Sequence, residues 1–426
     1  MDINRKTAFN TLMRIEKDGA YSNLELNSQI NRDRPDSPAL VREMVYGVLE
    51  NKMYLDYLLS QMVSKGLKSV KLPTLVIMRM GLYQMIFMTS VPEYAAVNES
   101  VKLARKFCHG QDGFVNGVLR NYSRKKDQLD QPDVEKDPLA RLSNKYSYDK
   151  WIVKLWMGQY GEEAAEKMLA AGNLTRPLTV RVNLMKNDRE RLADSLTKEG
   201  YTVDQTSYSQ RMLRIKGSGI LETKEYLDGM FSVQDEGSIL SIETLAPQSG
   251  ETIYDVCAAP GGKSLAAAEI MENSGTITSF DFYGNKLEPL KREMKRLGIS
   301  IIETKVSDAT QLNEELIETA DRVICDVPCT GLGVLGKKPE IKYRKIDDDG
   351  RSLAKKQLKI LENSAEYVKR GGFIIYSTCT VNKIENEQVV KSFLGTHQNF
   401  ESIEEKQLIP DAEGTDGFYF CKMRKL

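Results

Sequence analysis

The sequence predicts a multidomain protein with an all-helical N-terminal region, a small α+β unit and an α/β domain built on a parallel sheet. The chain of 426 residues is too long for one ordinary hydrophobic core, which predicts two or three domains. Up to residue 127, apolar side chains recur at the three- and four-residue spacing of amphipathic helices. From residue 251 onward, short apolar strands alternate with helical stretches, the pattern of βαβ units in a parallel sheet covered on both faces.

The helical prediction for residues 1–127 rests on several periodic segments. Ala8, Leu12 and Ile15 fall on one helical face, and residues 41–49 repeat this spacing. Two further apolar segments lie at 72–88 and 97–107. Because charged and polar side chains interrupt the first of them, it is predicted to be a buried helix rather than a membrane span.

Residues 127–138 are acidic, contain two prolines and lack periodicity, which predicts a linker. A helical stretch follows at 149–171, then a strand at 178–183 and a helix at 188–199 that Gly200 closes. The predicted domains are therefore 1–127, helical; 128–172, linker and helical connector; 173–245, small α+β unit; and 246–426, α/β domain.

Composition indicates a soluble globular protein, with 41% hydrophobic and 28% charged residues. The start, MDINRKTAFN, has no apolar signal region, so a cytoplasmic location is expected. The formal net charge is zero, so no global field draws the protein to nucleic acid. Basic segments at 120–126, 286–296 and 337–345 are candidate RNA contacts, although each alone is more typical of a solvated face.

The six cysteines are not expected to form a disulfide framework, because no export signal accompanies them. A zinc site is disfavoured too, since the chain has no C-x-x-C pair and only two histidines. Cys108, Cys325 and Cys421 are predicted to be small buried hydrophobic residues.

The informative residues of the α/β domain follow its strands. In such sheets, ligands bind beyond the carboxyl ends of the strands. The predicted strands are 252–256, 276–280, 301–306, 322–325 and 373–377.

A loop rich in small residues, DVCAAPGGKS at 255–264, follows the first predicted strand. Its tail resembles a phosphate-binding loop, but that motif would require glycine at position 257, where the chain has cysteine. Small residues let the backbone approach a ligand at a helix N-terminus. Asp281, 20 residues beyond Gly261, is suited to a ribose diol, and Asp308 after the third strand to an adenine edge.

These features predict an adenosine-type cofactor with no phosphate to neutralise. The candidate cofactor-binding residues are Cys257, Ala258, Ala259, Pro260, Gly261, Gly262, Lys263, Asp281, Asp308 and Asp326.

Two cysteines follow neighbouring strands, Cys329 in DVPCTG and Cys379 in STCT, over the same expected cleft. A thiol with a pKa of about 8.5 is only slightly ionised at neutral pH, and helix N-termini and Lys263 nearby would favour the thiolate. Two cysteines and an acidic residue suit methyl transfer to carbon 5 of cytosine, an atom too weakly nucleophilic to attack a methyl sulfonium directly.

Addition of a thiolate at carbon 6 would make carbon 5 nucleophilic. Asp326 would stabilise that adduct at the N3/N4 edge of the base, and a second cysteine suits the later step in which the first thiol leaves carbon 6.

With these three motifs and VQDEGS at 233–238, the sequence resembles the RNA cytosine-5 methyltransferase family of the Sun/NOL/NSUN type. The resemblance implies a Rossmann-like class I methyltransferase domain with S-adenosyl-L-methionine as methyl donor. It also implies that Cys379 is the nucleophile and Cys329 assists product release, with Asp326 and Lys263 in the catalytic set.

The N-terminal region resembles the NusB RNA-binding fold over 41–59, 91–107 and 114–121. A NusB-like domain joined to this catalytic domain is the layout of the B-type (Sun/Fmu) bacterial small-subunit rRNA methyltransferases. The resemblance implies 16S rRNA as partner for a monomer that requires neither a metal nor a membrane. A tRNA-directed relative and a non-catalytic RNA-binding assembly factor are the alternatives. The helical domain disfavours the first, and the presence of both cysteines disfavours the second.

Overall fold

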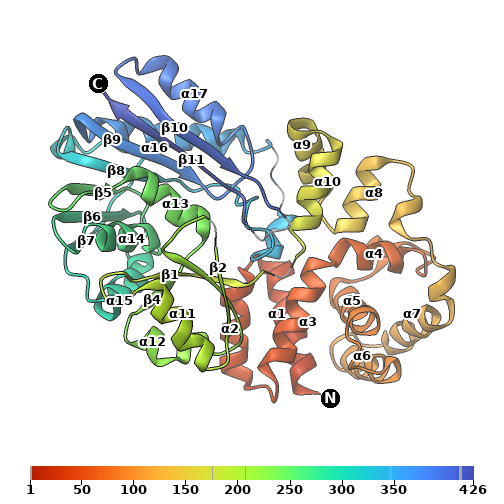
Figure 1. Cartoon of the computed structure of the whole chain (residues 1–426). Coiled ribbons are helices and arrows are strands. Elements are labelled where there is room, and N and C mark those ends of the chain that lie inside the picture. The colour runs from red at the N-terminus through yellow and green to blue at the C-terminus, as the bar shows by residue number, and fades with distance from the viewer. Residues whose placement is uncertain (1, 175, 207, 345, 347, 412–414) are drawn as a thin grey trace. The chain divides into compact units, whose positions relative to one another are not determined.

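The computed structural model describes residues 2–174, 176–206, 208–344, 346, 348–411 and 415–426 (Figure 1). It divides into two compact units. Unit 1 comprises Met1–Asn173 and Leu335–Lys345, and unit 2 comprises Leu174–Val334 and Ile346–Leu426. Lys345, the last residue of the predicted basic segment 337–345, lies outside the described residues.

Unit 1 is helical, as the sequence predicts. Asp2 caps the first helix by accepting a hydrogen bond from the Asn4 backbone N–H at 2.6 Å, and Ser37 caps the third. The periodic apolar side chains of the sequence form one buried core. The helices are α1 (Ile3–Asp18), α2 (Ser22–Asp33), α3 (Pro38–Glu50), α4 (Lys52–Ser60), α5 (Leu72–Phe87), α6 (Glu93–Phe107), α7 (Asp112–Lys125), α8 (Pro138–Tyr146), α9 (Lys150–Tyr160) and α10 (Glu162–Ala171), with 3-10 turns η1 (Leu67–Ser69), η2 (Lys126–Gln128), η3 (Pro132–Val134) and η7 (Pro339–Tyr343).

Helix α5 carries a buried arginine in its apolar sequence. Arg79 is only 4% exposed, and its guanidinium pairs with Glu16 at 2.8 Å and with Asp56 at 2.6 Å. A buried cation is tolerated when carboxylates satisfy its donors. Among the described residues, no helix is both long enough and apolar enough to cross a membrane.

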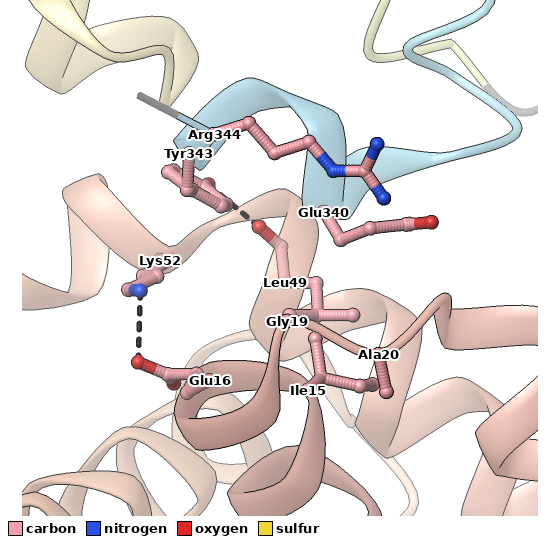
Figure 2. A pocket seen from close by; sticks show the side chains of 9 residues that line it. All are labelled: Ile15, Glu16, Gly19, Ala20, Leu49, Lys52, Glu340, Tyr343 and Arg344. Carbon is pink, nitrogen blue, oxygen red and sulfur yellow. Dashed lines mark hydrogen bonds and ion pairs between the residues drawn. The ribbon is translucent and has the colours of Figure 1, made fainter. Parts of the chain in front are cut away.

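Segment Leu335–Lys345 belongs to unit 1 by its contacts, although it lies within the sequence of the predicted α/β domain. Figure 2 shows part of it lining a cavity of about 210 Å³, where the Tyr343 hydroxyl donates to the Leu49 carbonyl at 2.6 Å. Lys342 is fully buried and donates to the Asn173 side chain, so it does not belong to a solvated basic face as its sequence pattern suggested. Burial lowers the pKa of Lys342 to about 7.

Unit 2 begins with a small antiparallel sheet in the order β2-β3-β1-β4. The sequence predicts its first strand and the helix that follows, but not β3 and β4. The elements are β1 (Leu178–Val182), β2 (Thr202–Gln205), β3 (Met212–Lys216), β4 (Phe231–Val233), α11 (Arg189–Lys198), η4 (Ile220–Glu222) and α12 (Lys224–Leu227).

A seven-stranded sheet in the order β10-β11-β9-β8-β5-β6-β7 forms the larger part of unit 2. Five strands are parallel, as predicted, but β11 pairs antiparallel with both β9 and β10, so the sheet is mixed. The strands are β5 (Thr252–Asp255), β6 (Thr276–Asp281), β7 (Ile302–Val306), β8 (Ala320–Asp326), β9 (Val368–Thr378), β10 (Phe400–Leu408) and β11 (Phe418–Lys425).

Helices cover both faces of this sheet, as expected for a doubly wound fold (Figure 1). Ile253 and its neighbours pack against α13, α14 and α15, whereas Tyr254 and its neighbours pack with α16 and α17. Because β6, β5, β8 and β9 are adjacent and parallel, their carboxyl ends meet at one edge. The helical elements are α13 (Glu236–Leu245), α14 (Gly262–Ile270), α15 (Glu288–Leu297), α16 (Arg351–Glu366), α17 (Glu387–Thr396), η5 (Gly284–Leu287) and η6 (Glu314–Leu316).

Candidate active site

A cavity of about 210 Å³ lies at the carboxyl end of β5, where the chain turns into α14. Most of the predicted cofactor loop lines it, together with Asp326 from the neighbouring strand β8. The lining residues are Val233, Gln234, Asp235, Ser238, Asp255, Cys257, Ala258, Ala259, Pro260, Gly262, Lys263 and Asp326.

Gly261 has no room for a side chain, although it is not among the lining residues. Its φ of +109° disfavours any L side chain, and a Cβ there would lie 2.5 Å from Leu290 Cδ1. Gly262 differs, because a Cβ on it would meet nothing closer than Gln234 Nε2 at 3.5 Å. Gly261 is therefore required by its backbone conformation, whereas Gly262 leaves open space beside the cavity.

Asp281, at the end of β6, contacts the loop at 257–263. Its Oδ2 accepts from the Ala259 backbone N–H at 3.2 Å, and its Oδ1 accepts from the Tyr283 backbone N–H at 3.0 Å. Asp308 follows β7, and its Oδ1 accepts from the Thr310 hydroxyl at 2.7 Å. This hydrogen bond lowers the pKa of Asp308. Asp281 thus contacts the loop directly, and neither Asp281 nor Asp308 is a lining residue of the cavity.

Asp255 is a lining residue that the sequence analysis did not single out. It is 1% exposed, and its Oδ2 accepts from the Ser264 hydroxyl at 2.6 Å. Within the described part of the chain, its Oδ1 is buried with no hydrogen-bond partner. Burial raises the pKa of Asp255 to about 7. Asp255 could have been found from the sequence, because it lies near the end of a predicted strand, directly before the glycine-containing loop.

Four residues of the VQDEGS motif at 233–238 also line the cavity, although the sequence indicated no particular role for them. Arg181 of β1 is 1% exposed and pairs with Glu269 of α14 at 2.8 Å. The same guanidinium donates to the side chain of Gln234 and to the Gly262 carbonyl at 3.2 Å. Arg181 therefore ties the small sheet to the beginning of α14.

Asp326 and Lys263 form an ion pair at the end of β8. Lys263 Nζ lies 2.7 Å from Asp326 Oδ2, and the Ser377 hydroxyl donates to Asp326 Oδ1 at 2.7 Å. The sequence predicts that Lys263 favours a cysteine thiolate. Its ammonium group instead contacts the carboxylate, so Lys263 orients and neutralises Asp326.

Cys329 and Cys379 lie side by side, with their sulfur atoms 3.2 Å apart. The hydrogen bond with Cys379 and burial both raise the pKa of Cys329 well above its ordinary value, so Cys329 keeps its proton. Burial likewise raises the pKa of the third cysteine at this edge, Cys257 in the cavity wall. The three cysteines predicted to be structural, Cys108, Cys325 and Cys421, are buried.

The buried carboxylate of Glu385 contacts the residue that follows Cys329, and the sequence did not predict it. It is 0% exposed and accepts hydrogen bonds from Thr330, the residue after Cys329. An acidic residue six positions after Cys379 was the only sequence signal, and the sequence alone gave it no partner.

Three family models match successive parts of the chain. The NusB family matches residues 2–124, the ferredoxin-like domain of the RsmF/B-like methyltransferases matches 148–221, and the family described as 16S rRNA methyltransferase RsmB/F matches 242–424.

Relatives cover nearly the whole chain. A protein named probable ribosomal RNA small subunit methyltransferase B from Bacillus subtilis is 39% identical, over 99% of this chain and 98% of its own length. Its counterpart from Synechocystis is 33% identical, over 93% of this chain and 90% of its own length. The crystal structure of a methyltransferase homologue from Pyrococcus horikoshii matches with a TM-score of 0.61 at 27% identity, over 68% of this chain and 100% of its own. The chain therefore belongs to the RsmB/F family of 16S rRNA methyltransferases.

Proposed function

We propose that this protein transfers a methyl group from S-adenosyl-L-methionine to carbon 5 of a cytosine in small-subunit rRNA, through a covalent adduct between Cys379 and carbon 6. The single observation that carries the proposal is the 3.2 Å approach of the Cys329 and Cys379 sulfur atoms beside Asp326. Family membership supports the methyl donor and the class of RNA.

The cavity at the end of β5 fits the methyl donor in its chemistry. Asp255 leaves one buried acceptor oxygen for a ligand donor, and Gly262 leaves the backbone open at the start of α14. In this proposal the loop 257–263 and Asp281 hold the cofactor, and Asp308 lies toward its adenine. When bound, the sulfonium supplies an electrophilic methyl group.

The protein's own groups divide the remaining chemistry. We assign the thiolate to Cys379, as the resemblance of its STCT motif implies, and the raised pKa of Cys329 agrees with that division of roles. Its addition at carbon 6 forms the carbon–sulfur bond and moves an electron pair toward carbon 5. Asp326, held by Lys263, hydrogen-bonds the N3/N4 edge of the base and stabilises the adduct.

Release requires two changes after carbon 5 has been methylated. The carbon 5 proton leaves to a base, and the electron pair of that C–H bond reforms the C5–C6 double bond as the Cys379 sulfur departs. We assign the assistance of this step to Cys329, whose sulfur lies 3.2 Å from that of Cys379. The target cytosine must be unstacked for the thiol to reach it.

The cysteine roles are tested with two alanine variants. Cys379→Ala should abolish methyl transfer, and Cys329→Ala should accumulate a covalent protein–RNA adduct that shifts in a denaturing gel. Normal methylation by Cys379→Ala would contradict the nucleophile assignment. The absence of an adduct in Cys329→Ala would contradict the release role.

The RNA class is tested separately. We propose that residues 1–127 contact rRNA and that residues 246–426 carry out the transfer. Purified tRNA and small-subunit rRNA should be offered side by side with labelled cofactor, and only the rRNA should be labelled. Bisulfite sequencing then identifies the methylated cytosine, and preferential labelling of tRNA would favour a tRNA-directed enzyme instead.

A further inference from the structure

Glu385 lies in the turn between β9 and α17, and it is 0% exposed. Its carboxylate accepts four hydrogen bonds, all from donors that come from three separate segments of unit 2. The donors are the Thr330 backbone N–H at 2.9 Å, the Thr330 hydroxyl at 2.5 Å, Gln357 Nε2 at 3.0 Å and Asn382 Nδ2 at 3.0 Å.

These partners connect Glu385 to both cysteine-bearing loops. Thr330 directly follows Cys329, and its hydroxyl lies 2.9 Å from the hydroxyl of Thr380, which directly follows Cys379. The Asn382 backbone N–H donates to the same Thr380 hydroxyl at 3.3 Å. One carboxylate therefore bridges two loops whose cysteines are 50 residues apart in the sequence.

Helix α16 provides a third contact to this group through Gln357. Gln357 Nε2 donates both to Glu385 and to the carbonyl of Pro328, the residue before Cys329, at 2.9 Å. Cys329 is thereby held through both of its neighbours in the chain. Gly350 lies close to this group, and a side chain there would crowd the carboxylate, because its Cβ would lie 3.1 Å from Glu385 Oε1.

The chemistry of this position requires an acceptor with two oxygens. Four donors converge on the carboxylate. If an amide nitrogen replaced one of its oxygens, the donors that now point at that oxygen would lose their acceptor. Burial raises the pKa of Glu385, and the hydrogen bonds from Thr330, Gln357 and Asn382 oppose that rise. A buried carboxylate is costly, and here its hydrogen bonds all serve to fix the loops.

We propose that Glu385 is a positioning residue that fixes the separation of the Cys329 and Cys379 sulfur atoms. It acts through Thr330 and Thr380 and does not touch the substrate. Its effect on catalysis rests on the function proposed above, whereas its effect on the sulfur separation does not. Loss of the bridge lets the two loops move independently and separates the thiols.

The sulfur separation can be read without any methyl transfer. Hydrogen peroxide oxidises two adjacent thiols to a disulfide, and each peroxide is reduced to two molecules of water. Full-length protein is treated with limiting peroxide, and the Cys329–Cys379 disulfide is quantified by peptide mass spectrometry with a dithiothreitol-reduced reference. The variants are Glu385→Gln and, as matched control, Glu387→Gln, which changes a partly buried carboxylate two residues away.

Glu385→Gln should form this disulfide about tenfold more slowly than wild type, because misplaced groups react far less often. Glu387→Gln should react at the wild-type rate. Equal rates for wild type and Glu385→Gln would overturn the proposal. This outcome does not depend on whether Cys379 is the catalytic nucleophile, so failure here is distinguishable from failure of the proposed function.

Kinetics separate positioning from a general structural role. Glu385→Gln should lower kcat about 100-fold, the effect of a displacement of about 1 Å in an active site, and leave the cofactor dissociation constant within about twofold of wild type. Thr330→Ser keeps the hydroxyl that donates to Glu385 and should retain most activity, whereas Thr330→Val should behave like Glu385→Gln. If Glu385→Gln fails to fold, Thr330→Ser and Thr330→Val provide the test. Equal activity and equal rates of disulfide formation in these two variants would overturn the proposal.

Discussion

Asp255 and Glu385 are both buried carboxylates at the carboxyl edge of the same sheet, yet they differ in how many hydrogen bonds they accept from the protein. Glu385 accepts four hydrogen bonds from the protein. Asp255 accepts one from Ser264, and among the described residues its other oxygen has no partner. Asp255 lines the cavity beside the glycine loop, whereas Glu385 contacts the residue that follows Cys329.

The difference separates two uses of a buried charge. A carboxylate oxygen can accept about two hydrogen bonds, and Glu385 already accepts two on each oxygen. It has no acceptor site left for a ligand and serves to hold the segments that donate to it. A carboxylate with an unused oxygen in a cavity wall has capacity left for a ligand, at a cost that the unbound protein carries. Arg181 resembles Glu385 in this respect, since its donors are shared among Glu269, Gln234 and the Gly262 carbonyl.

The largest effect on stability is expected from breaking the Arg181 cluster. Arg181→Met leaves Glu269 buried without its cation and should lower the free energy of unfolding by about 3–5 kcal/mol. Urea unfolding followed by circular dichroism measures this change. Combining Arg181→Met with Glu269→Leu should restore part of the loss, because no unpaired charge remains. If Arg181→Met were as stable as wild type, the hydrogen-bonded cluster around Arg181 would not contribute to the stability of the fold.

The glycine pair at the cavity is expected to show the next largest effect. Gly261→Ala forces a side chain into a φ of +109° and toward Leu290 Cδ1, and it should cost about 2–3 kcal/mol of stability. Gly262→Ala is the control, because its added methyl group would meet the Gln234 side chain no closer than 3.5 Å, an ordinary van der Waals contact. Thermal unfolding compares the two variants. If both lose the same stability, the conformation of Gly261 is not the cause.

Much of this fold could be predicted from local pattern. The apolar run expected to be a helix at 72–88 is α5, Leu72–Phe87, and the five strands expected between 252 and 377 are all present. The juxtaposition of Asp326, Cys329 and Cys379 also followed from sequence, because parallel strands end at a common edge. Strand β10 could not be predicted, since most side chains of this edge strand are exposed and show no buried alternation. Strand β11 was not predicted either, and most of its side chains are buried without a regular alternation.

The surroundings of the buried charges could not be predicted. Glu385 follows Cys379 by only six residues, but its role depends on Thr330, 55 residues earlier in the chain. The pattern around Lys342 is that of a solvated basic segment, and the side chain is buried because η7 packs in unit 1. Local sequence sets the periodicity of an element, whereas the pairing of a buried charge depends on contacts between distant segments.

Removing the charge of Asp255 should have a moderate effect with a distinctive pH dependence. The pKa of this carboxyl is raised from 3.8 to about 7 in the folded protein. Between those values the folded state holds a proton that the unfolded chain releases, so this group makes stability fall as pH rises. Asp255→Asn should flatten that fall between about pH 4 and 7, measured by urea unfolding at several pH values. An unchanged slope would show that Asp255 is ionised throughout.

The same variant also tests the unused oxygen. Above pH 7, where the Asp255 carboxyl is ionised, loss of its charge should weaken the binding of the positively charged S-adenosyl-L-methionine about tenfold, as for a charge-assisted hydrogen bond. Isothermal titration calorimetry measures this affinity. Glu385→Gln is the matched comparison, since a carboxylate fully used by the protein should not affect cofactor affinity. Equal weakening in both variants would remove the distinction between the two carboxylates.

The smallest effect is expected at the exposed pair Lys167–Glu163, which has the same 2.7 Å separation as the pair Lys263–Asp326. The side chains of the exposed pair are 75% and 85% exposed, whereas Lys263 is 10% exposed. Water and salt screen the exposed charges, and ordering two long side chains offsets most of their attraction, so Lys167→Ala should leave the free energy of unfolding nearly unchanged. Lys263→Ala should instead lower methyl transfer strongly, because Asp326 loses the group that orients it. A loss of stability in Lys167→Ala comparable to that of Arg181→Met would mean that distance, rather than burial, determines the contribution of ion pairs in this protein.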